Sequence, residues 1–267
     1  MQAEKLLKSG DLNAALAALQ AGIRANSSDA KLRVFLFQLL CVMGDWKRAI
    51  TQLKVSAELD PAATSMAQTY REGIICEVYR EKVFAGEKAP LIFGEPQEWS
   101  ALLIEALKTQ AGGRSEDAAA LRARAFEAAP AVSGRINGEL FKWVADADMR
   151  IGPVLEAVVN GRYFWMPFNV IRSITAEPPA DLRDCIWTPV NIVLQNGGDI
   201  VALIPTRYAG TADRGSDAEK LARQTSWTDA GAETYTGLGQ RLLATDAGDT
   251  AIMDLRELMF DQTDAEG

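Results

Sequence analysis

A short phrase recurs along the first half of the chain and constrains its fold more than any other feature. It reads GDLNAAL at 10–16, GDWKRAI at 44–50 and GRSEDAA at 113–119. In the first two copies, whose glycines are 34 residues apart, a large apolar residue follows Gly-Asp and an alanine comes three residues later. Glycine permits a tight turn between two helices, and alanine lets the helices pack closely. The phrase therefore predicts the corners of stacked helical hairpins.

A period of 34 residues is that of tetratricopeptide-like repeats, which are pairs of helices. Pro61 and Pro130 each lie 17 residues beyond the glycine of their copy, where a second helix ends, whereas Ser27 takes this place in the first copy. The third copy starts about two periods after the second, which predicts a degenerate repeat between them. Within that interval, residues 62–86 read as one long helix and residues 87–97 as a loop.

The segment at 31–43 is apolar around the whole circumference of a helix. Such a helix is buried between neighbours, as a stack of hairpins requires. Its apolar run at 34–43 is shorter than the ~20 residues of a membrane-spanning helix, so we expect no membrane partner. Residues 1–130 therefore read as a tetratricopeptide-like domain of roughly three and a half helical hairpins.

The second half of the chain changes to the pattern of short strands. Asn137 and Gly138 form a turn pair between two such stretches, and residues 191–205 contain Asn-Gly-Gly at their centre, which predicts two β-hairpins. The aromatic stretch at 162–174 contains Pro167, which predicts an edge strand or a bent strand.

Two short helices are expected among these strands. Residues 152–161 have a proline at the first helical position and a glycine just past the end. Ser216 and Glu219 have the spacing of a capping box. We therefore predict an α+β fold, in which residues 131–267 form a smaller, mostly β domain. A closed, barrel-like sheet is one arrangement that these strands could take.

The composition restricts the class of partner. A net charge of −8 argues against nucleic acid, whose phosphates need a basic face, and would suit a partner segment with basic residues. The three cysteines are widely spaced and form no CxxC, which indicates a reducing compartment. The start of the chain lacks the features of a signal peptide. We therefore expect a cytoplasmic protein.

The chemistry available to the chain is limited by the absence of histidine, which removes Ser-His and Cys-His nucleophile pairs and histidine metal ligands. Asp146, Asp148 and Glu156 could hold magnesium or calcium through oxygen ligands. In the favoured alternative, the two aspartates lie at the start of the helix expected at 152–161 and satisfy its free N–H groups. We therefore expect no metal and no cofactor.

Aromatic residues gather in the second half: Trp143, Tyr163, Phe164, Trp165, Phe168 and Trp187. Such side chains anchor many interfaces, but alternate residues of a strand also fill the core, and most of this set is expected there. Tyr163 and Trp165 are candidate partner-binding residues. Arg207 and Tyr208 follow a proline and are expected to reach the surface, either as further candidates or with the arginine fixing a loop.

Three stretches, in this order, carry a resemblance to a known family: GDWKRAITQLKVSAELDP at 44–61, FKWVADADMRIGPVLEAVVNGRYFWMPF at 141–168 and LIPTRYAGT at 203–211. They resemble the ImpE family, called SciE-type or TagJ in bacterial type VI secretion. The resemblance covers nearly the whole chain, and its middle stretch is the most specific. It implies a helical repeat region joined to a smaller domain that contains β-structure.

The resemblance also implies a non-enzymatic accessory protein. Such proteins are associated with the contractile sheath, where they bind the N-terminal helix of the small sheath protein TssB and are linked to sheath handling by the ClpV unfoldase. Without the resemblance, the residues themselves are also compatible with two other functions. One is a carboxylate- or metal-dependent enzyme with a site around the three carboxylates above and Arg207. The other is a scaffold that dimerises through the second domain, with Trp165 at the interface.

Overall fold

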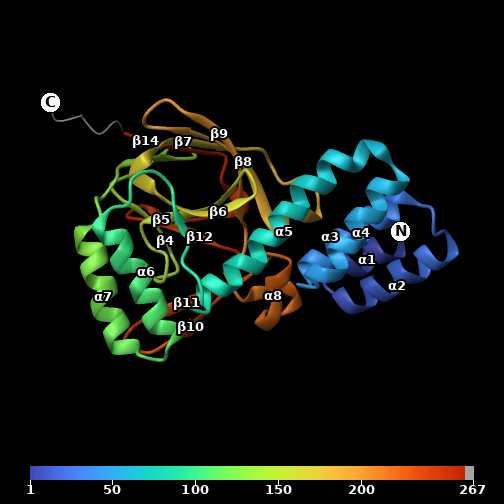
Figure 1. Cartoon of the computed structure of the whole chain (residues 1–267), viewed down its shortest axis with the longest axis horizontal. Coiled ribbons are helices and arrows are strands. Elements are labelled where there is room, and N and C mark those ends of the chain that lie inside the picture. Colours follow the sequence, from blue (N-terminus) through green and yellow to red (C-terminus); the bar gives the residue numbers. More distant parts are fainter. Residues whose placement is uncertain (262–267) are drawn as a thin grey trace.

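The computed structural model describes residues 1–261, and the first half is helical, as the repeated phrase predicts (Figure 1). The helices are α1 (Gln2–Lys8), α2 (Leu12–Ala25), α3 (Ala30–Val42), α4 (Trp46–Leu59), α5 (Thr64–Phe84), α6 (Glu98–Ala111) and α7 (Ser115–Ala128). Three hairpins form from α1 with α2, α3 with α4 and α6 with α7. α5 is followed by a loop and the short strand β1 (Leu91–Ile92) instead of a second helix. Three hairpins and one single helix agree with the predicted number.

Each copy of the phrase forms the corner of a hairpin. The corner glycines Gly10, Gly44 and Gly113 have φ angles of +85°, +76° and +80°, a left-handed conformation that glycine adopts without strain. In the first two copies, the side chains of Asp11 and Asp45 accept a hydrogen bond from the N–H of the third residue of the next helix. The phrase therefore ends one helix and caps the next.

The strands of the second half, together with β1 of the first half, form three sheets. The largest has the order β1-β6-β5-β9-β8-β7-β14-β2-β3, in which only β1 runs parallel to its neighbour. Within residues 1–261 its first and last strands do not pair, so this sheet is open and not a closed barrel. Its remaining strands are β2 (Gly134–Ile136), β3 (Glu139–Phe141), β5 (Val154–Val159), β6 (Arg162–Pro167), β7 (Ile171–Ala176), β8 (Trp187–Leu194), β9 (Asp199–Pro205) and β14 (Glu257–Phe260).

Two smaller sheets and six short helices complete the described fold, and all of them except η1 lie in the second half. A ribbon pairs β10 (Thr225–Asp229) with β11 (Tyr235–Gly239), and a three-stranded sheet has the order β13 (Gly248–Ala251), β12 (Leu242–Thr245), β4 (Val144–Asp146). The short helices are α8 (Thr211–Arg214), α9 (Asp217–Lys220), η1 (Pro61–Ala63), η2 (Phe168–Val170), η3 (Leu182–Cys185) and η4 (Ile252–Asp254). The capping box expected from Ser216 and Glu219 opens α9. The predicted class, helical repeats followed by a mostly β region, is confirmed.

The prediction of a helix at 152–161 is wrong, because this segment contains strand β5. All six residues of β5 are buried, and the strand pairs with β6 in antiparallel register. A short run that is buried on both faces has no alternation, so its pattern does not separate strand from helix. A turn signal was nevertheless present: Asn160 and Gly161 both have positive φ, +49° and +70°, as a type I′ hairpin requires.

The other strand predictions agree with the structure. The stretch at 162–174 is bent at its proline: β6 ends at Pro167, η2 follows and β7 begins at Ile171. The hairpin around Asn137 and Gly138 joins β2 to β3, and residues 191–205 lie within the hairpin of β8 and β9.

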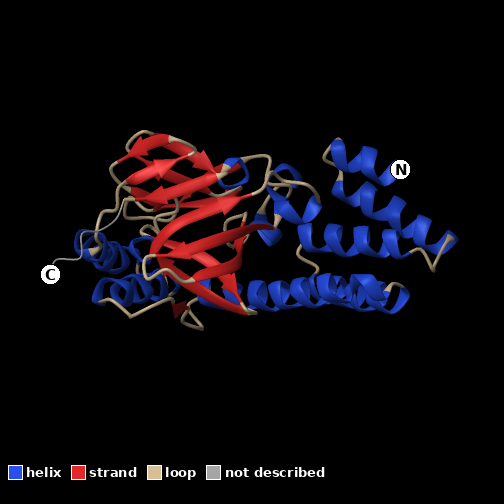
Figure 2. Ribbon diagram, turned by 90° about the horizontal axis from the view of Figure 1, so that it is seen from above, coloured by secondary structure: helices blue, strands red, loops and turns tan. Residues whose placement is uncertain are grey.

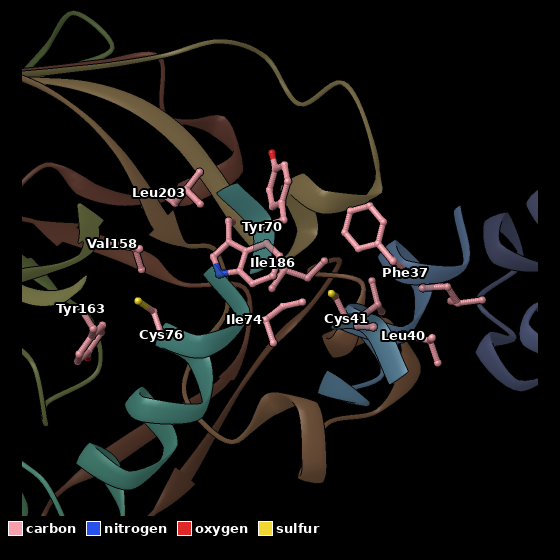
Figure 3. Packing of buried hydrophobic residues seen from close by; sticks show 14 of the residues in the cluster. Phe37, Leu40, Cys41, Tyr70, Ile74, Cys76, Val158, Tyr163, Ile186 and Leu203 are labelled. Carbon is pink, nitrogen blue, oxygen red and sulfur yellow. The ribbon is translucent and has the colours of Figure 1, made fainter. Parts of the chain in front are cut away.

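Two apolar cores lie on the two faces of the large sheet. The first joins the helices to the sheet: Ile74 and Cys76 of α5 belong to the same cluster as Val158 and Leu203 of the strands (Figure 3). The second fills the inside of the curled sheet, which lies at one end of the molecule with the first two hairpins at the other (Figure 2). Because the first core spans both halves of the chain, the boundary at 130/131 stays a prediction. Among residues 1–261, no helix combines the length and apolarity needed to span a membrane.

Candidate functional site

The buried carboxylate of Glu156, on β5, lies at the centre of the junction between α5 and the sheet. Arg80 of α5 donates to its two oxygens at 2.5 and 2.7 Å, the hydroxyl of Tyr163 also donates to it, and Arg241 lies 3.4 Å away. Burial by itself raises the pKa of Glu156, but Arg80 and Arg241 outweigh it and hold the pKa at about 2. The charged carboxylate therefore joins helix to sheet through a bidentate ion pair.

The two aspartates near this carboxylate are also paired with arginine. Asp146 accepts from Nε and Nη2 of Arg241 at 2.9 and 2.6 Å, and Asp148 lies 2.5 Å from Nη2 of Arg150. Burial raises the pKa of Asp146 to about 6, although Arg241 opposes this shift. Arg241 thus bridges Asp146 and Glu156 in the interior.

The three carboxylates do not form a metal site. Each is occupied by a guanidinium group, whose positive charge repels a cation at this distance. Across residues 1–261, no three histidine, cysteine, aspartate or glutamate side chains are placed to hold a metal ion. The sequence predicted that the two aspartates cap a helix. This prediction is wrong, because a strand follows them. Instead, the N–H of Asp148 donates to Asp146 at 2.8 Å in the connecting turn.

The four residues predicted to bind a partner are all buried. The exposed fractions of Tyr163, Trp165, Arg207 and Tyr208 are 3%, 0%, 4% and 1%, so the expectation that Arg207 and Tyr208 reach the surface is wrong. The indole N–H of Trp165 donates to the hydroxyl of Tyr163 at 2.8 Å, which positions that hydroxyl against the central carboxylate. Tyr208 covers Gly237, where a Cβ would lie 2.3 Å from its ring. These residues support the junction, and Trp165 offers no surface to a dimer.

Arginines from the second half of the chain cap the first helix of two hairpins. Nη1 of Arg207 donates to the carbonyl oxygen of Val42, at the end of α3, at 2.9 Å. Arg223 donates to the carbonyl oxygens of Leu7 and Lys8, at the end of α1, at 3.2 and 3.1 Å. The last carbonyl groups of a helix lack a partner from the next turn, so these arginines add donors at the helix ends. The oxygen of Leu7 also accepts the N–H of Gly10 at 3.0 Å.

Three further hydrogen bonds hold the corners of the hairpins. Asp217 accepts from the N–H of Leu12, the first residue of α2, at 3.1 Å. At the third corner, Ser115 and Gln110 donate to the carbonyl oxygen of Ala230 at 3.0 and 3.1 Å. At the second corner, Ala212 lies against Gly44. Residues 207–230 therefore contact all three copies of the phrase, which marks the places where the second half of the chain docks.

An open groove of about 330 Å³, here named the junction groove, lies where α5 meets the outer face of the large sheet. Its floor includes Thr175, Asn191 and Val201 of β7, β8 and β9. One wall is the loop at 177–184, and Tyr70 of α5 lines the side toward the hairpins. The groove combines apolar and charged side chains from the two halves of the chain.

Two other grooves are more apolar. One of about 330 Å³ is lined by Phe126 of α7 and by Trp143, which is 42% exposed and so departs from the buried members of the aromatic set. Another of about 240 Å³ lies between α5 and the start of β6, with Ile75 and Leu91 in its lining. Neither has an acidic residue among the residues that line it.

Known proteins agree with this architecture. The family model of the ImpE protein matches residues 138–259, and a tetratricopeptide repeat model matches residues 6–69. The chain is 55% identical over 265 residues to the type VI secretion system accessory component TagJ of Pseudomonas aeruginosa. The aligned region covers 99% of this chain and 93% of that protein. The chain belongs to the ImpE family. A crystal structure of a Vibrio parahaemolyticus protein has a TM-score of 0.90 to this ImpE-family chain, with 29% identity and 99% of both chains covered.

The resemblance seen in the sequence is thereby confirmed, but sequence reasoning missed the parts of this ImpE-family chain that shape its surface. The loop at 177–184 carries no motif of known chemistry, and its only signal was two prolines followed by closely spaced charges. The capping contacts of Arg223 and Asp217 link residues more than 200 positions apart, a separation at which spacing patterns carry no information.

Proposed function

We propose that this ImpE-family chain is a non-enzymatic, cytoplasmic adaptor of type VI secretion, which binds the N-terminal helix of the small, TssB-like sheath protein and links it to the ClpV unfoldase. The observation that supports this function is a stack of hairpins fixed by its corners to the second half of the chain, beside an open groove. A helix in such a groove needs apolar anchors and a polar rim. The 55% identical relative is an accessory component of type VI secretion.

The state of the four residues considered for an enzymatic site, Asp146, Asp148, Glu156 and Arg207, favours binding over catalysis. A general acid or base needs a free group with a pKa near the working pH. Glu156, Asp146 and Asp148 are each paired with an arginine at 2.5 to 2.6 Å. Burial lowers the pKa of Arg207 to about 10, which still leaves it protonated at neutral pH. Glu156 and Arg207 bind groups in the first half of the chain, whereas Asp146 and Asp148 are paired within the second. None of the three carboxylates is an unpaired reactive side chain.

A titration tests the proposal. A fluorescently labelled peptide that comprises the N-terminal helix of the sheath protein is mixed with increasing amounts of the full chain, and anisotropy is recorded at several salt concentrations. Saturable binding with a Kd of about 1 μM or tighter is expected for a specific helix in a groove. Absence of binding to the folded chain, with both the peptide and the assembled sheath, contradicts the proposal. The link to ClpV is tested by whether the chain retains ClpV on sheath-protein beads.

A further inference from the structure

The wall of the junction groove is fixed before any partner binds. Oδ2 of Asp184 accepts the N–H groups of Ala180 and Asp181 at 2.6 and 2.8 Å, which closes the loop on itself. The guanidinium group of Arg183 lies 4.6 Å from the centre of the Tyr70 ring and so attaches the loop to α5. A preorganised surface of this kind loses little conformational entropy when a partner binds.

The floor of the groove offers an uncovered apolar contact. Val201 is 71% exposed, the highest value among the large apolar side chains of residues 1–261. Strand register places it opposite Asn191, which is itself opposite Thr175, so the three side chains form one row across the outer face of the sheet. Pro189 is exposed beside them. In Figure 1, β7, β8 and β9 form the upper side of the molecule and no helix lies above them.

The charge of the groove decides what kind of partner fits. Glu177, Asp181 and Asp184 line it together with the single cation Arg183, and Arg183 is paired with Asp181. Two carboxylates therefore remain without a cation in the groove, and Glu177 is exposed. A basic segment is attracted to such a surface. Nucleic acid and a second copy of this acidic chain, whose net charge is −8, are repelled.

We propose that the junction groove binds a basic amphipathic helix. One or two apolar side chains of that helix pack on Val201, Pro189 and Tyr70, and lysine or arginine residues about one turn away face Glu177 and Asp184. The inference rests on the adaptor function proposed above, and it assigns the N-terminal helix of the sheath protein to this groove. The grooves at Phe126 and at Ile75 lack the acidic rim.

Two single substitutions test this assignment in the peptide titration described above. Val201→Asp places a charge on the apolar floor, and Glu177→Lys reverses the charge of the rim. The matched controls are Leu140→Asp, at a side chain that is 65% exposed on the far edge strand β3, and Asp249→Lys, at an exposed acid on β13. Because all four side chains are exposed, the variants should keep the thermal midpoint of the wild type.

The groove variants are expected to raise the Kd about tenfold or more, as for a residue at the centre of an interface, while the controls change it less than about twofold. Wild-type affinity in both groove variants overturns the assignment but leaves the adaptor function standing. Absence of binding by the wild type to the peptide overturns the assignment, and absence of binding to the assembled sheath as well overturns the adaptor function. A peptide whose lysines and arginines are replaced by glutamate supplies the reciprocal test: it should bind Glu177→Lys more tightly than the wild type, and the opposite order contradicts the charge pairing.

Discussion

Nη1 of Arg207 donates to the carbonyl oxygen of Val42 at 2.9 Å, across 165 positions of the chain. The same nitrogen donates to the carbonyl oxygen of Lys220 at 2.6 Å. One guanidinium group thus binds the end of α3 and the end of the short helix α9 together, in the interior. The second hairpin and the β region are therefore held as one unit at this point, and the orientation of the hairpins depends on a residue outside them.

Replacement of Arg207 by alanine should strongly reduce stability. The change leaves buried carbonyl groups without a donor and opens a cavity, and we expect the free energy of unfolding to fall by about 3 kcal/mol. Arg207→Lys should recover part of the loss, because one ammonium group can reach fewer acceptors. Urea denaturation measures both values. Arg223→Ala, which removes an exposed cap, is the matched control and should cost less than about 1 kcal/mol. Equal losses at the two sites would show that the cap at α3 has no special role.

The corners of the hairpins could be predicted from sequence, because their conformation is set locally. Gly44 requires a left-handed φ and Asp45 caps the helix that follows, and both residues are adjacent in the chain. What lies against those corners could not be predicted, since Arg207 meets its acceptors only after the chain has folded. For the same reason, the burial of Arg207 and Tyr208 could not be predicted, because the sequence shows only that they follow a proline. The strand β5 was missed because burial on both faces removes its period.

The ion pair between Arg80 and Glu156 should be essential for the junction. Arg80→Met removes the bidentate partner of a fully buried carboxylate, and a loss of about 3 to 5 kcal/mol is expected from breaking a buried pair on one side. The control is Arg48→Met, whose partner Asp45 lies 2.9 Å away on the surface, where exposed pairs contribute about 1 kcal/mol or less. Urea denaturation measures the loss in unfolding free energy for both variants. Similar losses would show that the pair of Arg80 and Glu156 stabilises the fold no more than a surface pair does.

The same carboxylate should make stability depend on acid pH. The pKa of Glu156 falls from an ordinary value of 4.5 to about 2 on folding, so the unfolded chain binds the proton more tightly. The contribution of Glu156 to stability is therefore complete above pH 4.5 and is lost as the pH falls from about 4.5 toward 2. We expect the difference in unfolding free energy between the wild type and Glu156→Gln to shrink over this range, as followed by urea denaturation at a series of pH values. A constant difference would place the carboxylate outside the network.

The thiols should be inert in the folded chain. Burial raises the pKa of Cys76 to about 12 and raises those of Cys41 and Cys185 as well, and the thiolate is the reactive form. At pH 8, a chromogenic disulfide reagent should therefore react slowly with the native chain and rapidly with all three cysteines in urea. Rapid reaction of one thiol in the native state, identified by mass spectrometry, would show that its cover opens.

Two glycines with nearly the same backbone conformation should respond differently to alanine. Gly44 and Gly113 have φ angles of +76° and +80°, so alanine strains the backbone at both, by about 1 to 2 kcal/mol. A Cβ at Gly44 would lie 2.8 Å from the Cβ of Ala212 in α8, whereas a Cβ at Gly113 meets nothing within 4 Å. Gly44→Ala should therefore lose about 1 to 3 kcal/mol more than Gly113→Ala, because overpacking adds to the strain.

The extra loss at Gly44 comes from a specific contact, so a second substitution should remove it. Ala212→Gly takes away the methyl group that the new Cβ would meet. In a double-mutant cycle measured by urea denaturation, Gly44→Ala should cost less in the Ala212→Gly background, down to the value of Gly113→Ala. If the cost stays the same, α8 does not contact this corner in solution. The arginine caps alone would then account for the docking of residues 207–230 on the hairpins.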